Sequence, residues 1–279
     1  MANDLDRILP LQPGGSMPPL FCVHAVSGSA YSYVQLAQQL GPDQPVYGFE
    51  APGFDNDRAP VPSVTALADE YTAILREFQP GGDYRLFGWS LGGLVAFEMA
   101  KRLAAAGAPA KALIMVDSGL PVEMPLPPER EILRRFIRDM MGLSDETPPE
   151  VEAIFGDLPR HVAPETAFEA VITAGILPEE IDAALLAGQY GVFRALLEGF
   201  YSIDVTGPYG GPAVHIMAER SPAEEMRWSR VIPGIREHTL PRTTHHSIMT
   251  GDNLMTLTGI VQGVLVGTNE DARHVVHQV

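Results

Sequence analysis

Short apolar runs alternate along this chain with longer stretches in which apolar residues recur at helical spacing. The short runs are typical of buried strands, and the longer stretches are typical of helices with one apolar face. Strands are predicted at residues 19–24, 45–49, 84–87, 112–116 and 213–217, and helices at residues 31–40, 64–78 and 91–106. Strands that alternate with helices in this way indicate parallel βαβ units in a doubly wound sheet.

The pattern changes between residues 119 and 205. Short amphipathic helical pieces, such as Glu131–Met141 and Glu179–Leu186, alternate here with prolines: Pro125, Pro127, Pro128, Pro148, Pro149, Pro159, Pro164 and Pro178. Insertions at the edge of a sheet where ligands bind commonly carry function. We therefore predict a helical lid over about 119–205, inserted into a single domain that spans 1–279 and ends in a frayed tail over about 269–279.

The composition is typical of one globular domain that does not enter a membrane. The chain has 279 residues, of which 46% are hydrophobic and 19% charged, and this length is enough for a substantial core. No apolar run approaches the roughly 20 residues of a membrane helix. Residues 1–10 carry Asp4 and Asp6 in place of the basic start of a signal peptide. We expect a cytoplasmic protein, and a monomer.

The net charge and the cysteine count argue against several other classes of function. A formal net charge of −16, with no long basic block, disfavours nucleic acid as a partner. Cys22 is the only cysteine, which excludes an intramolecular disulfide and a cysteine metal cluster, and its apolar neighbours predict a buried structural role. The glycine-rich stretch 207–212 lacks the lysine of a phosphate loop. We expect neither a metal nor a bound cofactor.

The segment Gly88–Gly93, with the sequence GWSLGG, lies between a predicted strand and a predicted helix. This is the context of a nucleophile elbow, in which a serine is held in a tight strand-to-helix turn. Gly88 and Gly92 remove the side chains that would collide in such a turn. The helix that begins near Leu91 directs free N–H groups towards a developing oxyanion. We therefore predict that Ser90 is the nucleophile of an α/β-hydrolase fold, with a mostly parallel sheet flanked by helices.

An oxyanion hole needs two backbone N–H donors, one from the residue after the serine and one from the loop after an earlier strand. Leu91 supplies the first donor. Val26 is the candidate for the second, because Ser27, Gly28 and Ser29 beside it are small enough for an acyl carbonyl to approach closely.

A serine hydroxyl is a weak nucleophile near neutral pH and needs a general base within hydrogen-bond reach. Six of the eight histidines are less plausible: His24 and His215 lie at or in predicted strands, His238 precedes another apolar pair, His161 lies in the lid, and His274 and His277 lie in the tail. The other two, His245 and His246, lie in a loop after the last strand-like segment, where the serine–acid–histidine order of these hydrolases puts the base. We assign His245 and keep His246 as the alternative, because spacing alone cannot choose between adjacent residues.

The acid of the triad must orient the imidazole and stabilise its cationic form. Asp117 ends the predicted strand 112–116, so its carboxylate should emerge at the same edge of the sheet as Ser90. Ser118 and Gly119 follow it, and a simple turn cap is the structural alternative. Glu219 is the competing acid, because it follows the next predicted strand, which is the other position used by this fold. We favour Asp117.

Several motifs spread over most of the chain carry a family resemblance. They are Leu9–Leu11, Pro19–His24, Tyr47–Phe49 with Ala51–Gly53, Leu67–Tyr71, Tyr84–Gly93 and His245–Met249. Together they resemble the terminal thioesterase domain of non-ribosomal peptide synthetases. The tryptophan before Ser90 is more like these domains than like the standalone editing thioesterases, which usually have histidine there. The lid is weakly matched.

The resemblance implies that a peptidyl or acyl chain passes from the phosphopantetheine thiol of a carrier protein to Ser90, with Asp117 and His245 completing the triad. Water or an internal nucleophile would then release the chain by hydrolysis or macrocyclisation, as in antibiotic biosynthesis. The partner is an acyl or peptidyl carrier protein. The net charge of −16 would repel an acidic carrier, so docking would need a local basic or apolar patch.

Three positions depart from the family pattern. Ala25 stands where proline usually follows His24, Thr243 stands where glycine is common before the base, and His246 replaces an aromatic residue. The first departure bears on the oxyanion loop, and the last puts a second titratable group beside the base. Either could change the balance between hydrolysis and cyclisation.

Other functions fit the same motifs. An acyltransferase would pass the acyl group from Ser90 to an external alcohol or amine, and exclusion of water by the lid would decide that outcome. A standalone editing thioesterase would use the same triad. The non-enzymatic alternative is a module that docks a carrier protein or binds a ligand and has lost its catalytic site. In such a module, Ser90, Asp117 and His245 would lie too far apart to form hydrogen bonds with one another. The identity of the acyl chain depends on lid side chains, which the motifs do not cover.

Overall fold

The centre of the structure is a sheet of seven strands in the order β1-β3-β2-β4-β5-β6-β7. The structure is a computed structural model that describes residues 8–121, 125–142 and 145–276, with side chains as far as residue 267. The strands are β1 (Ile8–Gln12), β2 (Leu20–Val23), β3 (Val46–Phe49), β4 (Arg85–Trp89), β5 (Ala112–Val116), β6 (Ala213–Ala218) and β7 (Arg236–Leu240). Only β1 is antiparallel to its neighbour, so the predicted mostly parallel sheet of an α/β-hydrolase is confirmed.

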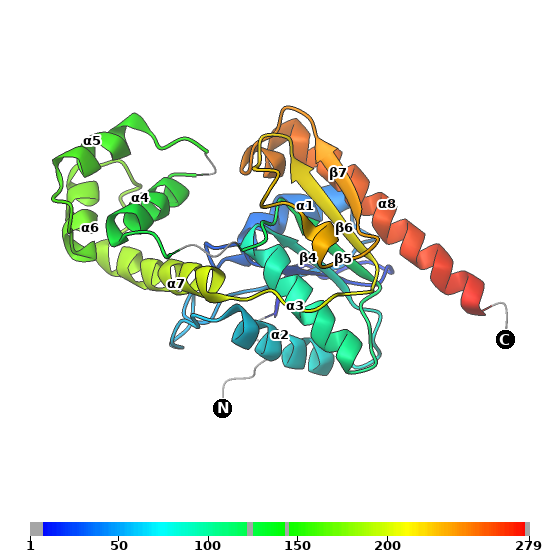
Figure 1. Cartoon of the computed structure of the whole chain (residues 1–279). Coiled ribbons are helices and arrows are strands. Elements are labelled where there is room, and N and C mark those ends of the chain that lie inside the picture. Colours follow the sequence, from blue (N-terminus) through cyan, green and yellow to red (C-terminus); the bar gives the residue numbers. More distant parts are fainter. Residues whose placement is uncertain (1–7, 122–124, 143–144, 277–279) are drawn as a thin grey trace.

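Helices cover both faces of this sheet (Figure 1). On one face, α2 (Val64–Phe78) and α3 (Leu91–Ala105) share a hydrophobic cluster with Leu86 of β4. On the other, α1 (Val34–Leu40) and α8 (Gly251–Val276) share a second cluster with Phe87, the next residue of the same strand. Successive side chains of a strand point to opposite faces, and both faces are buried, which explains why the central strands are continuous apolar runs.

Strands β2 to β6 coincide with the five predicted strands to within a residue or two. Ser63 caps α2, since its hydroxyl accepts a hydrogen bond from the Ala66 N–H at 3.2 Å. The short helices η2 (Ala30–Tyr33), η3 (Trp228–Arg230) and η4 (Ser247–Met249) complete the core of the fold.

Two strands and one helix of the core were not among the predicted elements: β1, β7 and α8. Pro10 argues against a strand in the sequence, because proline has no N–H to donate to a neighbouring strand. The strand β1 nevertheless forms because it lies at the edge of the sheet, where a missing N–H donor is tolerated. Residues 269–276 continue α8, so the prediction of a frayed tail is wrong for them, and residues 277–279 lie outside the described part of the chain. Among the described residues, no helix is both long and apolar enough to cross a membrane.

The lid predicted from the prolines consists of four helices between β5 and β6: α4 (Glu129–Met140), α5 (Pro149–Asp157), α6 (Pro164–Thr173) and α7 (Ala183–Ser202). Pro149 and Pro164 begin helices, because proline is tolerated in the first turn. The predicted helical piece Glu179–Leu186 is wrong in its first half, since Asp182 caps α7 by accepting a hydrogen bond from the Leu185 N–H at 2.8 Å.

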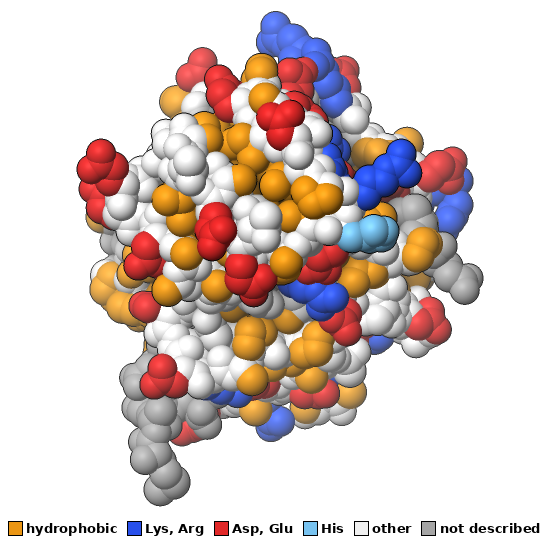
Figure 2. All heavy atoms as spheres, turned by 90° about the vertical axis from the view of Figure 1, so that its left-hand side faces the viewer, with side chains coloured by type: hydrophobic (Ala, Val, Ile, Leu, Met, Phe, Trp, Pro, Cys, Tyr) orange, Lys and Arg blue, Asp and Glu red, His pale blue; other side chains and the backbone are white. Residues whose placement is uncertain are grey.

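The lid has a hydrophobic cluster of its own, in which the ring of Phe136 lies 5.3 to 6.2 Å from those of Phe168, Tyr190 and Phe193. It stands to one side of the sheet and is joined to it mainly through α7, which contacts α2 (Figure 1). The face on the lid side of the molecule mixes hydrophobic and acidic side chains. Basic side chains lie at its upper and right-hand edges, near its centre and at its lower edge (Figure 2).

We expect Phe136→Ala to loosen the lid without loosening the sheet, because Phe136 belongs to the lid cluster and not to the two clusters of the core. Removing a buried phenylalanine side chain costs about 3–5 kcal/mol. Hydrogen exchange should therefore accelerate in α4 to α7 and stay unchanged in β4 and β5. Phe97→Ala is the matched control. Phe97 lies in α3 and belongs to the hydrophobic cluster that α2 and α3 share with the sheet, so this variant should accelerate exchange in the sheet. Equal acceleration in both regions for Phe136→Ala would show that the lid is not a separate unit.

Candidate active site

Ser90 lies in the turn that connects β4 to α3, with φ 57° and ψ −127°. A positive φ is uncommon for a residue other than glycine and marks local strain, as in a nucleophile elbow. A side chain at Gly88 would overlap the backbone of Gly92, and one at Gly92 would overlap the Val23 carbonyl, so both predictions of small residues are confirmed. A side chain at Gly93 would likewise overlap the Ser118 hydroxyl, a constraint that the sequence analysis did not predict.

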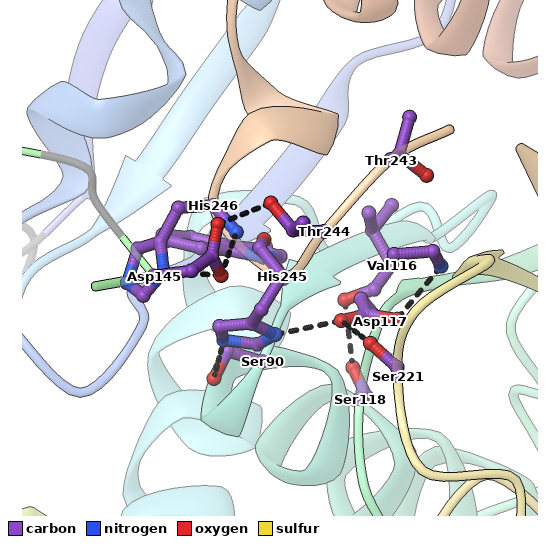
Figure 3. A network of polar contacts seen from close by, with 12 residues as sticks. Ser90, Val116, Asp117, Ser118, Asp145, Ser221, Thr243, Thr244, His245 and His246 are labelled. Carbon is purple, nitrogen blue, oxygen red and sulfur yellow. Dashed lines mark hydrogen bonds and ion pairs between the residues drawn. The ribbon is translucent and has the colours of Figure 1, made fainter. Parts of the chain in front are cut away.

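The imidazole of His245 lies between Ser90 and Asp117 (Figure 3). Its Nε2 is 3.0 Å from Ser90 Oγ, and its Nδ1 is 2.7 Å from Asp117 Oδ2. An ionised Asp117 accepts the proton of Nδ1–H, which leaves the lone pair of Nε2 free to accept the serine proton. The three residues that the sequence assigned to a triad are thus brought together.

Asp117 is fully buried, and its carboxylate is held by two further donors. The N–H of Ala218 donates to Oδ1 at 2.8 Å, and the hydroxyl of Ser221 donates to Oδ2 at 2.7 Å. Burial opposes ionisation of this carboxyl, but the hydrogen bonds from His245, Ser221 and Ala218 outweigh it and hold its pKa below the ordinary value. Ser221 was missed from the sequence, because nothing in its own neighbourhood marks it as a partner of a residue 104 positions away.

The two alternatives that the sequence left open lie elsewhere. The Glu219 carboxylate accepts a hydrogen bond from the Arg242 N–H at 2.6 Å, on the exposed side of the loop that follows β6. The Nδ1 of His246 is 3.0 Å from Asp145 Oδ1. The geometry therefore favours Asp117 as the acid and His245 as the base.

Trp89, the residue before Ser90, fixes the loop that carries His245. Its indole stacks on the His245 ring, with centroids 5.1 Å apart and an interplanar angle of 29°. Its Nε1–H donates to the His245 carbonyl at 3.1 Å. The indole also makes an edge-to-face contact with the ring of His246, with centroids 5.7 Å apart. The elbow therefore positions the base as well as the nucleophile.

Asp145, in the segment that follows α4, ties the lid to the same loop (Figure 3). Its carboxylate accepts hydrogen bonds from the Thr244 hydroxyl and from the backbone N–H of His246, the latter at 3.2 Å. These bonds outweigh burial and lower the pKa of Asp145. Burial lowers the pKa of His246, against the opposing effect of its bond to Asp145. Both neighbours of His245 are thus anchored to the lid.

Two other histidines near the site have structural roles. His24 is fully buried, its Nε2 lies 2.8 Å from the Tyr71 hydroxyl, and burial lowers its pKa to about 4. His215 accepts a hydrogen bond from the Ser118 N–H at 3.3 Å, and burial lowers its pKa to about 4 as well. Both imidazoles are neutral near pH 7, and neither contacts Ser90.

A cavity of about 280 Å³ opens above Ser90, between the sheet edge and the lid. Val26 and Leu91 line it next to the serine, where the sequence placed the two oxyanion donors. Leu91 begins α3, so its N–H has no partner within the helix. Further lining residues come from α4 (Arg135), from α7 (Leu197, Phe200 and Tyr201) and from the segment after β6 (Ser221, Pro222, Glu225 and Met226). Among the described residues, no group of three His, Cys, Asp or Glu side chains is placed to hold a metal ion.

Curated relatives of this chain are large synthetases. It is 41% identical over 120 residues to malpibaldin synthetase of Mortierella alpina, which covers 42% of this chain and 2% of the synthetase. It is 40% identical over 114 residues to a dimodular nonribosomal peptide synthase of Bacillus subtilis, which covers 41% of this chain and 5% of that protein. The chain therefore spans only a few per cent of the length of these relatives.

Solved structures share the fold along nearly the whole chain. A four-domain nonribosomal peptide synthetase aligns with a TM-score of 0.77 and 23% identity, over 92% of this chain and 20% of that one. The thioesterase domain SrfTE, which cyclises the lipopeptide antibiotic surfactin, aligns with a TM-score of 0.66 and 20% identity, over 95% of this chain and 97% of that one. The thioesterase domain family matches residues 18–199, more than half of the sequence. This chain therefore belongs to the thioesterase domain family.

Proposed function

We propose that this chain takes an acyl or peptidyl group from the phosphopantetheine thioester of a carrier protein onto Ser90 and then releases it by hydrolysis or macrocyclisation. The observation that carries the proposal is the chain of hydrogen bonds from Ser90 through His245 to Asp117 at the base of a cavity. The synthetase relatives support the carrier protein as the donor of the acyl group.

In the first half of the reaction, Ser90 Oγ attacks the thioester carbonyl carbon while its proton moves to His245 Nε2. The negative charge that forms on the carbonyl oxygen is stabilised by the N–H groups of Leu91 and Val26. The tetrahedral intermediate then collapses with cleavage of the carbon–sulfur bond. His245 returns the proton to the departing sulfur, so the pantetheine arm leaves as a thiol and the acyl group remains as an ester on Ser90.

In the second half, His245 accepts a proton from the attacking nucleophile, which adds to the ester carbonyl, and Ser90 Oγ regains a proton as it leaves. Water gives a free acid, and a hydroxyl or amine of the same acyl chain gives a macrocycle. An external alcohol or amine would give transfer. The hydrogen bonds from Thr244 and His246 to Asp145 connect the loop of His245 to the lid. The position of the lid, which controls the access of water, is therefore coupled to the position of the base.

Ser90→Ala should abolish the covalent adduct, because no other nucleophile lies at the Nε2 of His245. The measurement is intact-mass analysis after exposure to a panel of acyl-pantetheine thioesters, which also identifies the accepted chain and its product. Ser229→Ala, an exposed serine outside the cavity, is the control and should form the adduct as the wild-type protein does. An adduct of unchanged yield on Ser90→Ala would remove Ser90 from the mechanism.

Asp117→Asn should lower kcat by about four orders of magnitude, since an amide at this position disturbs the tautomer and orientation of the imidazole. Glu219→Gln should change kcat little, because Glu219 bonds to the Arg242 N–H and not to His245. Release of the pantetheine thiol gives both rates. The opposite ranking of the two variants would transfer the role of the acid to Glu219.

His245→Ala should slow acylation by roughly three orders of magnitude or more, since it removes the general base. His246→Phe should retain acylation and change mainly the ratio of products, because Asp145 keeps its bond to Thr244 and the aromatic contact with Trp89 is preserved. Stopped-flow measurement of thiol release, with circular dichroism to establish folding, distinguishes the two. An inactive His246→Phe beside an active His245→Ala would mean that the base is His246.

A further inference from the structure

Three charged side chains line the cavity above Ser90: Asp117, Arg135 and Glu225. Asp117 is committed to the imidazole and to its two other donors. The remaining lining is largely apolar and includes Val26, Leu91, Leu197, Phe200 and Met226. An acyl chain in this cavity therefore meets an apolar wall interrupted by two further charges, and their availability decides which polar group the chain can carry.

The positive charge of Arg135 is already compensated. Its Nε–H donates to Glu131 Oε1 at 2.8 Å, one helical turn earlier in α4, and its guanidinium also donates to the Tyr201 hydroxyl at 3.4 Å. An anionic group on the substrate would have to compete with Glu131 for this arginine.

The Glu225 carboxylate, by contrast, has no charged partner among the residues that the structure describes. Arg227 and Arg230, which follow it in the chain, both pair with the neighbouring Glu224 instead. Glu225 is partly buried, whereas Glu224 is exposed. Of the two carboxylates in the cavity, Glu225 is therefore the one whose side chain has no hydrogen-bonding or charged partner among the described residues.

The backbone holds Glu225 firmly against the strand end that carries Asp117. The Glu225 carbonyl accepts a hydrogen bond from the Leu120 N–H at 2.6 Å. Three residues later, the indole of Trp228 donates to the Ser118 carbonyl at 2.6 Å. Gly119 lies between these two anchor points and also lines the cavity, and a β-carbon built there would stand 3.7 Å from Glu225 Oε2, so the carboxylate lies beside the part of the cavity wall that Gly119 forms.

We infer that Glu225 forms a subsite for a protonated amine on the acyl chain, so that the preferred substrates have an apolar body and a remote amino group. The inference rests on the proposed function. An aliphatic amine, with a pKa of about 10, is protonated at neutral pH. A charge-assisted hydrogen bond to a partly buried carboxylate is stronger than a neutral one. The buried charge of Asp117 adds to the negative potential of the same wall.

The test compares three pantetheine thioesters of equal chain length that differ only in the terminal group: aminooctanoyl, nonanoyl and carboxyoctanoyl. The ratio of kcat/KM for the amine to kcat/KM for the methyl analogue should fall about tenfold in Glu225→Gln, the scale of one charge-assisted hydrogen bond. Glu224→Gln is the matched control, since it removes an adjacent carboxylate outside the cavity, and it should leave the ratio unchanged. An unchanged ratio in Glu225→Gln overturns the inference, and so does a preference of the wild-type protein for the carboxylate.

Calorimetric binding of the same thioesters to the Ser90→Ala protein separates this inference from the proposed function. Tighter binding of the aminooctanoyl thioester than of its methyl analogue, lost when Glu225→Gln is added, supports the subsite even if the wild-type protein turns over none of the three. Equal binding of the charged and neutral chains overturns the subsite even if all three are hydrolysed.

Discussion

The catalytic geometry depends on how closely α3 approaches β2 and β4. Gly92 lies against the Val23 carbonyl, and Gly88 lies against the first turn of α3, so neither position has room for a side chain. This close approach forces the chain to reverse at Ser90 with a positive φ, which lifts the hydroxyl above the edge of the sheet. It also directs the free N–H groups of α3 into the cavity, where an oxyanion would form. The strained turn at Ser90, the proposed nucleophile, and the free N–H groups of the proposed oxyanion hole are thus two results of one packing constraint.

The proposed base, His245, is held by three segments that lie far from it in the sequence. Asp117 at the end of β5 holds the ring through Nδ1, and Trp89 at the end of β4 covers one face of the ring and binds its carbonyl. Asp145 in the lid binds both neighbours of His245. A preorganised base needs little rearrangement when the serine proton is transferred. Because one of these supports belongs to the lid, the position of the lid is linked to that of the loop that carries His245.

The charges around the site are arranged differently from the charge of the whole chain. The net charge of −16 describes a mostly exposed acidic surface. Inside the cavity, Asp117 is satisfied by three donors and Arg135 by Glu131, and only Glu225 remains available. The charge that the cavity presents therefore depends on the pairing of individual side chains, which total composition does not report.

The sequence by itself determined the features that depend on neighbouring residues. The strand, turn and helix around Ser90 are contiguous, so their apolar pattern and their glycines revealed the elbow, and the order of strand ends pointed to Asp117 and His245. The sequence left His246 and Glu219 open as alternatives to the favoured His245 and Asp117, and it did not reveal β1, β7 or α8. The choice of acid and base, together with the roles of Ser221, Trp89 and Asp145, was decided by contacts between residues 101 to 156 positions apart. Such contacts exist only once the sheet has brought distant strand ends to one edge, because parallel strands place residues from remote parts of the chain side by side.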